Sequence, residues 1–367
     1  MKKVQLLISI DRIDQREKWN TILRGLPYAH VLQTWEWGEF KQQTTGWTPE
    51  RFAYQDSSKG YRAAASVLTR HIGPFAVMYV PKGPALEYSD PALVEMVLDH
   101  LQKLAKKRHV IWLKIDPDLP LGTGIPGAAD HPEHPDPDGQ ALKNLLERRG
   151  WRFSADQVQF RNTFIHDLSS SEDALLAGMN QGTRRKIRQA EKAGVVVREA
   201  DLRNTDLQTL YDLYVMTGER QGFTTRPLDY YKTAWQAFGQ AGLAYGLLAE
   251  VENRAVAGLI LFHFGRKVWY FYGMSSNQQR DAQPNYALQW AALRWAKSQG
   301  YALYDWWGAP NQFDESDPMW GVFRFKEGFG GQVVRHIGAW DFVAYPFLYQ
   351  VYEKVIPRIL NFMRRKN

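Results

Sequence analysis

The sequence of 367 residues contains no cysteine. This absence excludes disulfide bonds, thiolate nucleophiles and cysteine-based metal sites together. It is also typical of proteins in a reducing compartment. Covalent catalysis by a thiol is therefore excluded.

Long apolar segments are absent as well. No apolar stretch approaches the roughly 18 residues that are needed to span a bilayer. Residues 1–12 reach charged side chains too soon to form the apolar region of a signal peptide. We therefore expect a cytoplasmic protein.

The composition is otherwise that of an ordinary soluble globular protein, with 44% hydrophobic residues. The length favours two or three domains. The formal net charge of +7 favours anionic partners such as nucleic acid, nucleotide diphosphates or an acidic membrane surface.

One pattern occurs twice along the chain: a strand pair, a helix, and a strand that ends in aspartate. This repetition predicts a duplicated α/β domain with mixed sheets. The first copy comprises residues 61–70, 75–80, 91–107 and 110–116, and the second 243–251, 256–264, 268–273, 285–299 and 301–305.

Between the copies, residues 117–139 are rich in Pro, Gly and Asp and are predicted to be a loop, followed by a helix over 140–149. His131 and His134 lie in that loop. Their spacing among prolines, without a further run of ligands, favours a solvated loop, so no metal site is expected.

The segment 320–331 places a single lysine, Lys326, among aromatic residues and glycines. Aromatic residues exclude water and glycines allow close approach of a ligand. The charge of a cation held there is therefore screened less than it would be in bulk solvent. Lys326 is therefore our candidate for the chemical centre. The alternative is a surface lysine on a helix.

Cationic residues gather in two other places. Residues 183–194 read as a helix that Gly194 ends, and its cations either form a solvated face or contact an RNA backbone. Arg226 precedes a proline at the head of another helix, where it either binds an anion or pairs with Asp229 or Glu219.

Six segments in order resemble the Fem-type peptidyltransferases, tandem GNAT-like proteins that build the cross-bridge of peptidoglycan precursors. The resemblance covers nearly the whole chain and is closest to the FemX type, because the long helical arm of FemA and FemB has no counterpart. The six segments are residues 37–41, 79–84, 183–194, 225–230, 265–272 and 325–326.

The resemblance implies an α/β (α+β) fold of two GNAT-like acyltransferase domains with mixed sheets. We assign residues 1–157 plus 340–367 to the first, acceptor-binding domain, and 158–339 to the second, acyl-transfer domain. Residues 327–331 are more glycine-rich than in FemX, which leaves the acceptor and the added amino acid open.

The resemblance also implies roles for individual residues. It assigns Lys326 to the reaction, and Lys41 and Arg226 to the diphosphate of the acceptor. The substrate-binding residues it adds are Tyr230, Tyr272 and Phe325, and the tRNA-contact candidates are Arg184, Arg185, Lys186 and Arg188. Asp305, at a strand end, is a candidate to accept the proton of the amine, or is buried for structure.

The expected function is transfer of an amino acid from aminoacyl-tRNA to the stem peptide of a peptidoglycan precursor. The expected partners are aminoacyl-tRNA and UDP-MurNAc-pentapeptide or a lipid-linked precursor. No cofactor is expected, and the protein is expected to be a monomer. Peripheral membrane contact through residues 351–367 is expected if the acceptor is lipid-linked.

Two other functions stay open. A GNAT N-acyltransferase would use acyl-CoA, whose pyrophosphate needs a glycine-containing loop, but residues 277–285 contain no glycine and include Pro284. A non-catalytic binder of RNA or of a membrane surface would use the basic segments and would not need Lys326.

Overall fold

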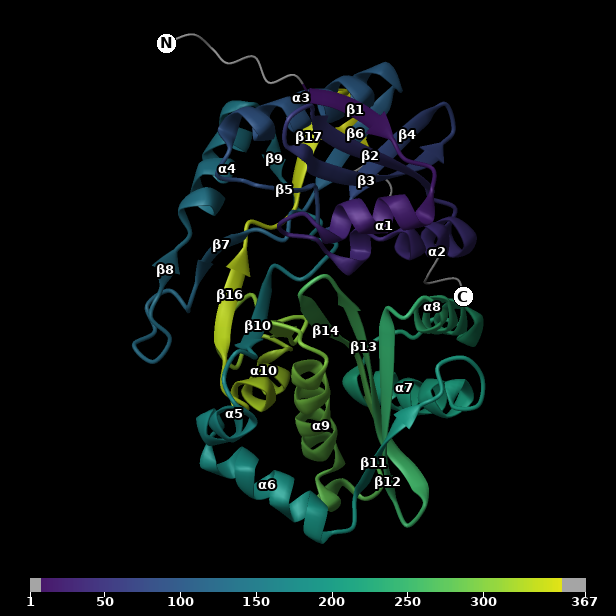
Figure 1. The fold of residues 1–367 in the computed structure, drawn as a ribbon, viewed down its shortest axis with the longest axis vertical. Helices are drawn as coiled ribbons and strands as arrows, with labels where there is room; N and C mark the ends of the chain where they lie inside the picture. Colours follow the sequence, from purple (N-terminus) through teal and green to yellow (C-terminus); the bar gives the residue numbers. More distant parts are fainter. Residues whose placement is uncertain (1–7, 352–367) are drawn as a thin grey trace. The chain divides into compact units, whose positions relative to one another are not determined.

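The computed structural model describes residues 8–351, which form two compact units (Figure 1). Gly122–His134 and Phe160–Arg335 make up the second unit, and the other described residues make up the first. Gly122–His134 thus lies with the second unit, although it falls within 1–157 of the expected first domain. The basic end of the chain, 364–366, lies outside the described residues.

The first unit is built on a sheet of eight strands. Their bounds are β1 Ile8–Arg12, β2 Thr48–Asp56, β3 Gly60–Ile72, β4 Phe75–Val80, β5 Ala85–Leu86, β6 Val110–Ile115, β9 Arg152–Phe153 and β17 Trp340–Val343. The order is β1-β2-β3-β4-β6-β17-β9, with β5 on β3. Neighbours are antiparallel except β4 and β6, which are parallel. A helix connects these two strands, as a parallel crossover requires.

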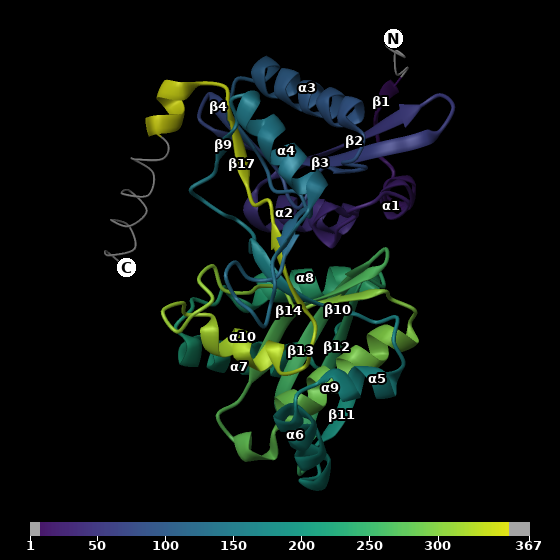
Figure 2. The ribbon, with the colours of Figure 1, turned by 90° about the vertical axis from the view of Figure 1, so that its left-hand side faces the viewer.

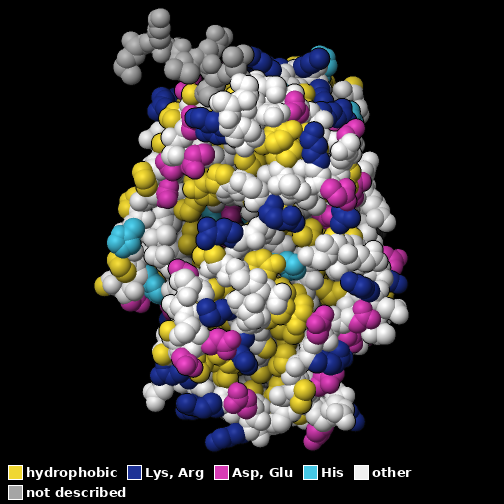
Figure 3. Space-filling view, viewed as in Figure 1, with side chains coloured by type: hydrophobic (Ala, Val, Ile, Leu, Met, Phe, Trp, Pro, Cys, Tyr) yellow, Lys and Arg dark blue, Asp and Glu magenta, His cyan; other side chains and the backbone are white. Residues whose placement is uncertain are grey.

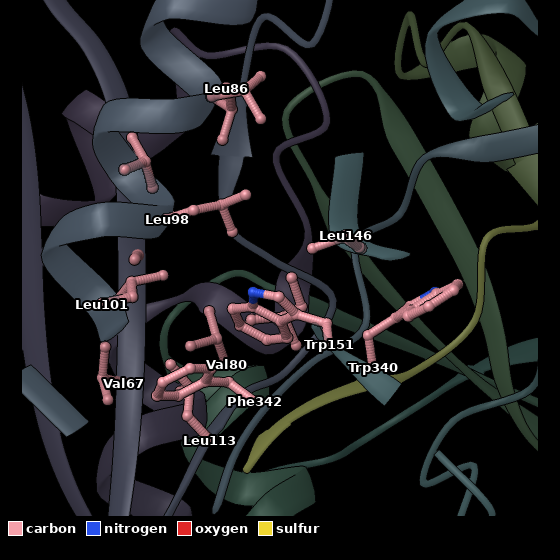
Figure 4. Close-up of a cluster of buried hydrophobic side chains, with 14 of the residues drawn as sticks. Val67, Val80, Leu86, Leu98, Leu101, Leu113, Leu146, Trp151, Trp340 and Phe342 are labelled. Atoms are coloured by element: carbon pink, nitrogen blue, oxygen red, sulfur yellow. The ribbon is translucent and has the colours of Figure 1, made fainter. Parts of the chain in front are cut away.

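Helices complete the first unit: α1 Arg16–Arg24, η1 Val31–Gln33, α2 Trp35–Thr45, α3 Pro91–Lys107 and α4 Pro137–Arg148. The buried residues of α3 recur every three or four positions, and they pack with α4 on the sheet (Figure 2). Figure 4 shows this core, where Leu98 and Leu101 of α3 lie near Leu113, Trp151 and Phe342. β17 thus brings residues from the end of the chain into the first core.

The second sheet has nine strands. Their bounds are β7 Pro120–Thr123, β8 His134–Pro135, β10 Asn162–Asp167, β11 Val196–Ala200, β12 Ala244–Val251, β13 Arg254–Phe264, β14 Lys267–Ser275, β15 Leu303–Asp305 and β16 Gln332–His336. The order is β11-β12-β13-β14-β15-β10-β16-β7-β8. β14 and β15 are parallel, and the other pairs from β11 to β16 are antiparallel.

Helices cover both faces of this sheet: α5 Glu172–Gly178, α6 Gln181–Lys192, α7 Leu207–Gln221, α8 Leu228–Gln240, η2 Arg280–Ala282, α9 Pro284–Ser298 and α10 Trp320–Glu327. Alternate residues of β13 point to opposite faces. Leu259 and Leu261 share a core with Leu288 and other residues of α9, whereas Phe262 stacks on Phe238 of α8 at 4.3 Å. α9 and α8 accordingly lie on opposite sides of the strands (Figure 1).

The duplication predicted from the sequence is confirmed by the pairing of strands. In each sheet, four antiparallel strands come first, β1 to β4 in one and β11 to β14 in the other. A helix then leads to a strand that pairs parallel with the fourth, and the next strand in the sheet is antiparallel again. The parallel strands are β6 and β15, followed by Asp116 and ending in Asp305 respectively. The predicted fold class, an α/β (α+β) fold of two tandem units with mixed sheets, is confirmed as well.

The expectation that residues 117–139 are entirely loop is wrong. β7 and β8 lie in this segment, and α4 begins at Pro137 rather than at 140. Asp136 caps α4, since its carboxylate accepts a hydrogen bond from the N–H of Gly139 at 2.9 Å. Within residues 8–351, every helix is too short or too polar to span a membrane.

Candidate active site

Lys326 lies on α10 with its side chain turned into the second unit, and the residue is only 3% exposed. Its Nζ donates hydrogen bonds to three consecutive backbone carbonyls, those of Trp306 at 2.8 Å, Trp307 at 3.1 Å and Gly308 at 2.6 Å. We call these three oxygens the carbonyl cage. The alternative interpretation of Lys326 as a surface lysine is therefore wrong.

The backbone of 306–308 turns so that its carbonyls converge. Trp307 and Gly308 both have positive φ, 50° and 95°. At Gly308 an added Cβ would lie 3.0 Å from the Phe160 ring, so both conformation and space favour glycine. The Asp305 carboxylate accepts hydrogen bonds from the Trp307 N–H at 2.9 Å and from the Thr163 hydroxyl, which anchors the turn to β10.

Burial lowers the pKa of Lys326 from 10.5 to about 7, and the nearby charge of Asp305 opposes this change. Both protonation states are therefore accessible near neutral pH. An ammonium has three N–H donors, and the cage accepts all three. A direct hydrogen bond from Lys326 to a substrate oxyanion requires one of the cage bonds to open.

The His166 side chain makes hydrogen bonds to residues on both sides of Lys326 in the sequence, Trp306 and Phe329. No sequence pattern singled out this histidine. Its Nδ1 accepts a hydrogen bond from Trp306 Nε1 at 2.8 Å, so its Nε2 carries the proton and donates to the Phe329 carbonyl at 2.9 Å. Burial lowers the pKa of His166, which favours this neutral form. The ring thus ties the cage to the end of α10.

Arg226, Tyr230 and Tyr272, three of the expected substrate-binding residues, lie together in the second unit. The Arg226 guanidinium lies 4.6 Å from the centroid of the Tyr230 ring, at the exposed start of α8. Tyr231 links the two tyrosines, with ring centroids 5.4 Å from Tyr230 and 6.0 Å from Tyr272. Burial raises the pKa of Tyr272 well above its ordinary value. Among residues 8–351, the guanidinium contacts this ring rather than Asp229 or Glu219.

Aromatic rings connect this group to the carbonyl cage. Tyr272 contacts Phe271 at 5.1 Å, and Phe271 stacks on Trp307 at 4.7 Å and 26°. Trp307 supplies one of the cage carbonyls. We call this run of rings the aromatic layer; it consists of Tyr230, Tyr231, Tyr272, Phe271 and Trp307. The exposed Arg226 lies at one end of the layer, and the buried Lys326 lies at the other.

The four basic candidates on α6 do not act as one group. Arg184 donates hydrogen bonds to the carbonyls of Ala177 at 2.8 Å and Met179 at 2.5 Å, and so closes the end of α5. Lys186 donates to the Tyr286 hydroxyl at 2.9 Å. Arg185 and Arg188 are exposed. On the face in Figure 3, basic side chains lie scattered among acidic ones.

Lys41 lies in the first unit, on α2. Its Nζ is 4.7 Å from the centroid of the Trp37 ring and 5.0 Å from that of Phe40, so the predicted grouping of these residues on one face is confirmed. Thr34 caps this helix, as predicted, by accepting a hydrogen bond from the Trp37 N–H.

The first unit also contains buried charges that the sequence analysis missed. Asp116 accepts hydrogen bonds from the Tyr79 hydroxyl at 2.7 Å and from the Lys82 N–H, and burial raises its pKa to about 6. Asp118 lies 3.8 Å from Lys82 Nζ and 3.3 Å from His336 Nε2. The signal that could have found Asp116 was its position in the repeat, which matches that of Asp305.

A metal centre is not formed by the histidines of the predicted loop. His131 Nε2 lies 2.9 Å from a carboxylate oxygen of Glu327, and His134 is exposed in β8. Within residues 8–351, no group of three potential ligands is arranged to hold a metal ion.

The model of the FemAB family matches residues 16–255 and 246–356 of this chain. Among the curated relatives, the lipid II:glycine glycyltransferase of Staphylococcus haemolyticus is 26% identical, over 94% of this chain and 95% of its own length. The protein of the same name from Staphylococcus aureus strain USA300 is 25% identical over the same shares.

Solved structures share the fold. A crystal structure of FemX superposes with a TM-score of 0.81 at 24% identity, covering 94% of this chain and all of that one. A tandem GNAT protein from the clavulanic acid biosynthesis pathway superposes with a TM-score of 0.54 at 11% identity, covering 92% and 99%. The likeness therefore extends over both units.

Proposed function

This chain belongs to the FemAB family, and we propose that it is a transferase that moves an amino acid from aminoacyl-tRNA to the stem peptide of a peptidoglycan precursor. The relatives named lipid II:glycine glycyltransferase support the transfer of an amino acid to a precursor. The match covers 95% of the length of these relatives, so we propose the whole transfer reaction, and not one part of it, for this chain.

The observation that carries the proposal is the buried, caged Lys326 bordered by aromatic rings. An aminoacyl ester is already activated, so aminolysis needs mainly positioning and stabilisation of an oxyanion. Positioning can supply about 7 to 11 kcal/mol and one oxyanion donor about 3 to 4 kcal/mol. A buried cation suits this chemistry, and because the ester is already activated, the reaction needs no covalent enzyme intermediate.

The reaction proceeds by attack of the stem-peptide amine on the ester carbonyl carbon. The carbonyl oxygen becomes an oxyanion, and its collapse breaks the bond to the ribose oxygen of the tRNA. The amine loses one proton and the ribose oxygen gains one, so the step balances without a cofactor. In this proposal the ammonium of Lys326 stabilises the oxyanion after one cage bond opens.

Asp305 serves to position the cage rather than to accept a proton. One of its carboxylate oxygens accepts hydrogen bonds from Thr163 and Trp307, and the other lies 3.8 Å from Lys267 Nζ. The residue is 1% exposed. Its negative charge also favours the protonated form of Lys326.

Arg226 is proposed to hold a phosphate of the acceptor. The guanidinium is exposed at the start of α8 and is oriented by the Tyr230 ring, so it can present two N–H groups to a phosphate. Lys41 is proposed for the same chemistry in the first unit. The names of the relatives favour a lipid-linked acceptor over the UDP-linked one.

The acyl-CoA alternative is disfavoured by the loop before α9. The N–H groups of Gln278, Ala282, Gln283 and Tyr286 donate hydrogen bonds within the loop, and Pro284 has none. A pyrophosphate cradle needs several such groups directed at the ligand.

The test is mass spectrometry of lipid II and of UDP-MurNAc-pentapeptide after incubation with the protein and a full set of charged tRNAs. Wild type should add the mass of an amino acid residue to one precursor, and Lys326→Met should not. Arg324→Met is the matched control, because Arg324 lies on the same helix but is exposed, and it should retain activity.

Two results would count against this function. If wild type leaves both precursors unchanged, the aminoacyl-transfer proposal fails. If Lys326→Met transfers as fast as wild type, the role of Lys326 fails. If neither protein transfers an amino acid, a non-catalytic binder of RNA or membranes is indicated.

A further inference from the structure

A second, smaller group of buried apolar residues lies in the first unit, separate from the core that α3 and α4 cover. Its members come from β4, β6 and a short helix at 346–351. Figure 2 shows this helix in yellow, on the outside of the first unit. None of the group has a role in the transfer proposed above. The buried members are Val77, Ile111, Trp112 and Tyr349.

Large apolar side chains around this group remain open to solvent. Phe347 is 76% exposed, the largest fraction among the bulky apolar residues at positions 8–351, and Val351 follows one turn later at 40%. Trp47, Ile72, Phe75 and Leu348 pack on the group and are only partly buried. We call these six residues the apolar patch. Exposed apolar side chains gathered in one place mark an interaction site.

The short helix is held in place by the rest of the first unit. The buried Tyr349 hydroxyl donates a hydrogen bond to the Asp341 carboxylate of β17 at 2.8 Å. Tyr345, just before the helix, has its hydroxyl 2.9 Å from His109 Nδ1. Phe347 and Val351 are four residues apart and therefore share the face of the helix that points to solvent. The exposure of the apolar patch is thus fixed by the fold.

One member of the apolar patch lies next to Lys41, which is proposed above to hold a phosphate of the acceptor. The N–H of Trp47 donates a hydrogen bond to the Lys41 carbonyl at 3.3 Å, so Trp47 directly follows the turn of α2 that carries Lys41. Arg70 is exposed on β3, two residues before Ile72. Tryptophan beside cationic side chains is typical of surfaces that lie at the boundary between lipid and water.

The sequence continues this chemistry beyond 351. Residues 352–367 lie outside the described part of the chain, but they include five cations and one acid, which supply +4 of the formal net charge of +7. The match to the family model ends at 356, so four of the five cations lie beyond it. The cations are Lys354, Arg358, Arg364, Arg365 and Lys366. The large apolar residues between them are Val355, Ile356, Ile359, Leu360, Phe362 and Met363.

We propose that the apolar patch and the cationic residues after it dock the protein on the surface of an anionic phospholipid bilayer. The apolar side chains enter the boundary between headgroups and hydrocarbon, and the cations meet the lipid phosphates. Stable peripheral binding needs two such signals together. RNA would also attract the cations, but aliphatic side chains neither stack on bases nor bind phosphates.

The proposal rests on the proposed function in one respect, the role of Lys41. Docking brings this lysine to the surface from which the diphosphate of a lipid-linked acceptor projects. It therefore favours the lipid-linked acceptor over the UDP-linked one.

The test is sedimentation of the full chain with sucrose-loaded vesicles of phosphatidylcholine that contain either one-third phosphatidylglycerol or none. Wild type should bind the vesicles with phosphatidylglycerol about tenfold more tightly or better, and Arg364→Gln with Arg365→Gln should weaken this binding about 25-fold, about fivefold for each cation. Phe347→Ser should weaken it about tenfold and leave the fold intact, because the ring is exposed. The matched controls are Met216→Ser, at an exposed apolar residue of α7, and Lys192→Gln, at an exposed cation of α6; each should change binding less than about twofold.

Equal binding to both kinds of vesicle, or binding that Phe347→Ser leaves unchanged, would overturn the proposal. If wild type binds neither vesicle, and an oligoribonucleotide loses affinity in the same variants, the surface is an RNA site instead. If wild type binds neither vesicle and forms a dimer that Phe347→Ser abolishes, the surface is an interface between copies of this chain.

Transfer to lipid II separates docking from the proposed function. With lipid II in anionic vesicles, Phe347→Ser should raise KM about tenfold, whereas in detergent micelles its rate should agree with that of wild type within about twofold. An unchanged KM in vesicles would defeat the docking proposal alone. If wild type transfers to no precursor, the proposed function fails, while vesicle sedimentation still tests docking.

Discussion

Replacing Lys326 with methionine should change how the stability of the protein depends on pH. The folded state holds this lysine with a pKa of about 7, whereas the unfolded chain has the ordinary value of 10.5. Below pH 7 both states are protonated and the pH dependence is flat. Between these two pKa values the unfolded state binds one more proton than the folded state, so the stability of wild type rises with pH relative to Lys326→Met.

The magnitude follows from the count of protons. One proton bound only by the unfolded state changes the free energy of unfolding by about 1.4 kcal/mol per pH unit. Over the whole interval from about 7 to 10.5 the change amounts to about 5 kcal/mol. The loss of the three cage hydrogen bonds in the variant adds a contribution that does not depend on pH. The slope of the unfolding free energy against pH is therefore the informative quantity.

The assay is urea unfolding of both proteins at intervals from pH 6 to pH 10, followed by circular dichroism. We expect the difference in unfolding free energy, wild type minus Lys326→Met, to be flat up to about pH 7 and to climb above it. Ionisable groups distant from position 326 titrate alike in both proteins, so their contributions to the unfolding free energy cancel in this difference. Arg324→Met keeps the lysine and should follow wild type. A difference that stays constant from pH 7 to pH 10 would refute the assignment of a lowered pKa to the buried lysine.

Three other substitutions test separate parts of the site. Arg226→Lys should raise KM for the precursor about tenfold and leave kcat within twofold, because lysine cannot form a bidentate contact with phosphate; initial rates with an unchanged KM would contradict this. Gly308→Ala should lower the free energy of unfolding by about 1 to 3 kcal/mol, because φ is 95° and the new Cβ meets Phe160, and urea titration should detect it. His166→Phe should cost about 1 to 3 kcal/mol by leaving the Trp306 N–H without an acceptor. Since the pKa of His166 is lowered on folding, wild type should also lose stability as pH falls below 6.5, and a variant with the same acid sensitivity would argue against a neutral ring.

Elements with a strong local pattern could be predicted from the sequence. The bounds of β4 and α3 were predicted as the structure has them, and the repeat followed from the order of strands and helices. The periodicity of apolar residues is local and needs no knowledge of neighbours. The start of α4 was missed because its signal is the cap at Asp136, within a segment dominated by Pro and Gly.

The candidate site could be predicted only in part, because its geometry depends on residues distant in sequence. The aromatic and glycine context of Lys326 was visible, but its cage comes from residues 306–308, and His166 lies far earlier in the chain. Likewise, the basic composition of α6 was visible in the sequence. No local pattern, however, distinguishes Arg184, which closes the end of α5, from Lys186, which donates to the Tyr286 hydroxyl.

The carbonyl cage links the protonation of Lys326 to the order of the loop at 306–308. A neutral amine has two N–H donors, so it can satisfy only two of the three carbonyls, whereas the ammonium satisfies all of them. With a pKa of about 7, the lysine passes between these two conditions in the pH range of ordinary assays. Gain or loss of a single proton should therefore tighten or loosen the loop that borders the aromatic layer, and the rigidity of this site becomes a titratable property.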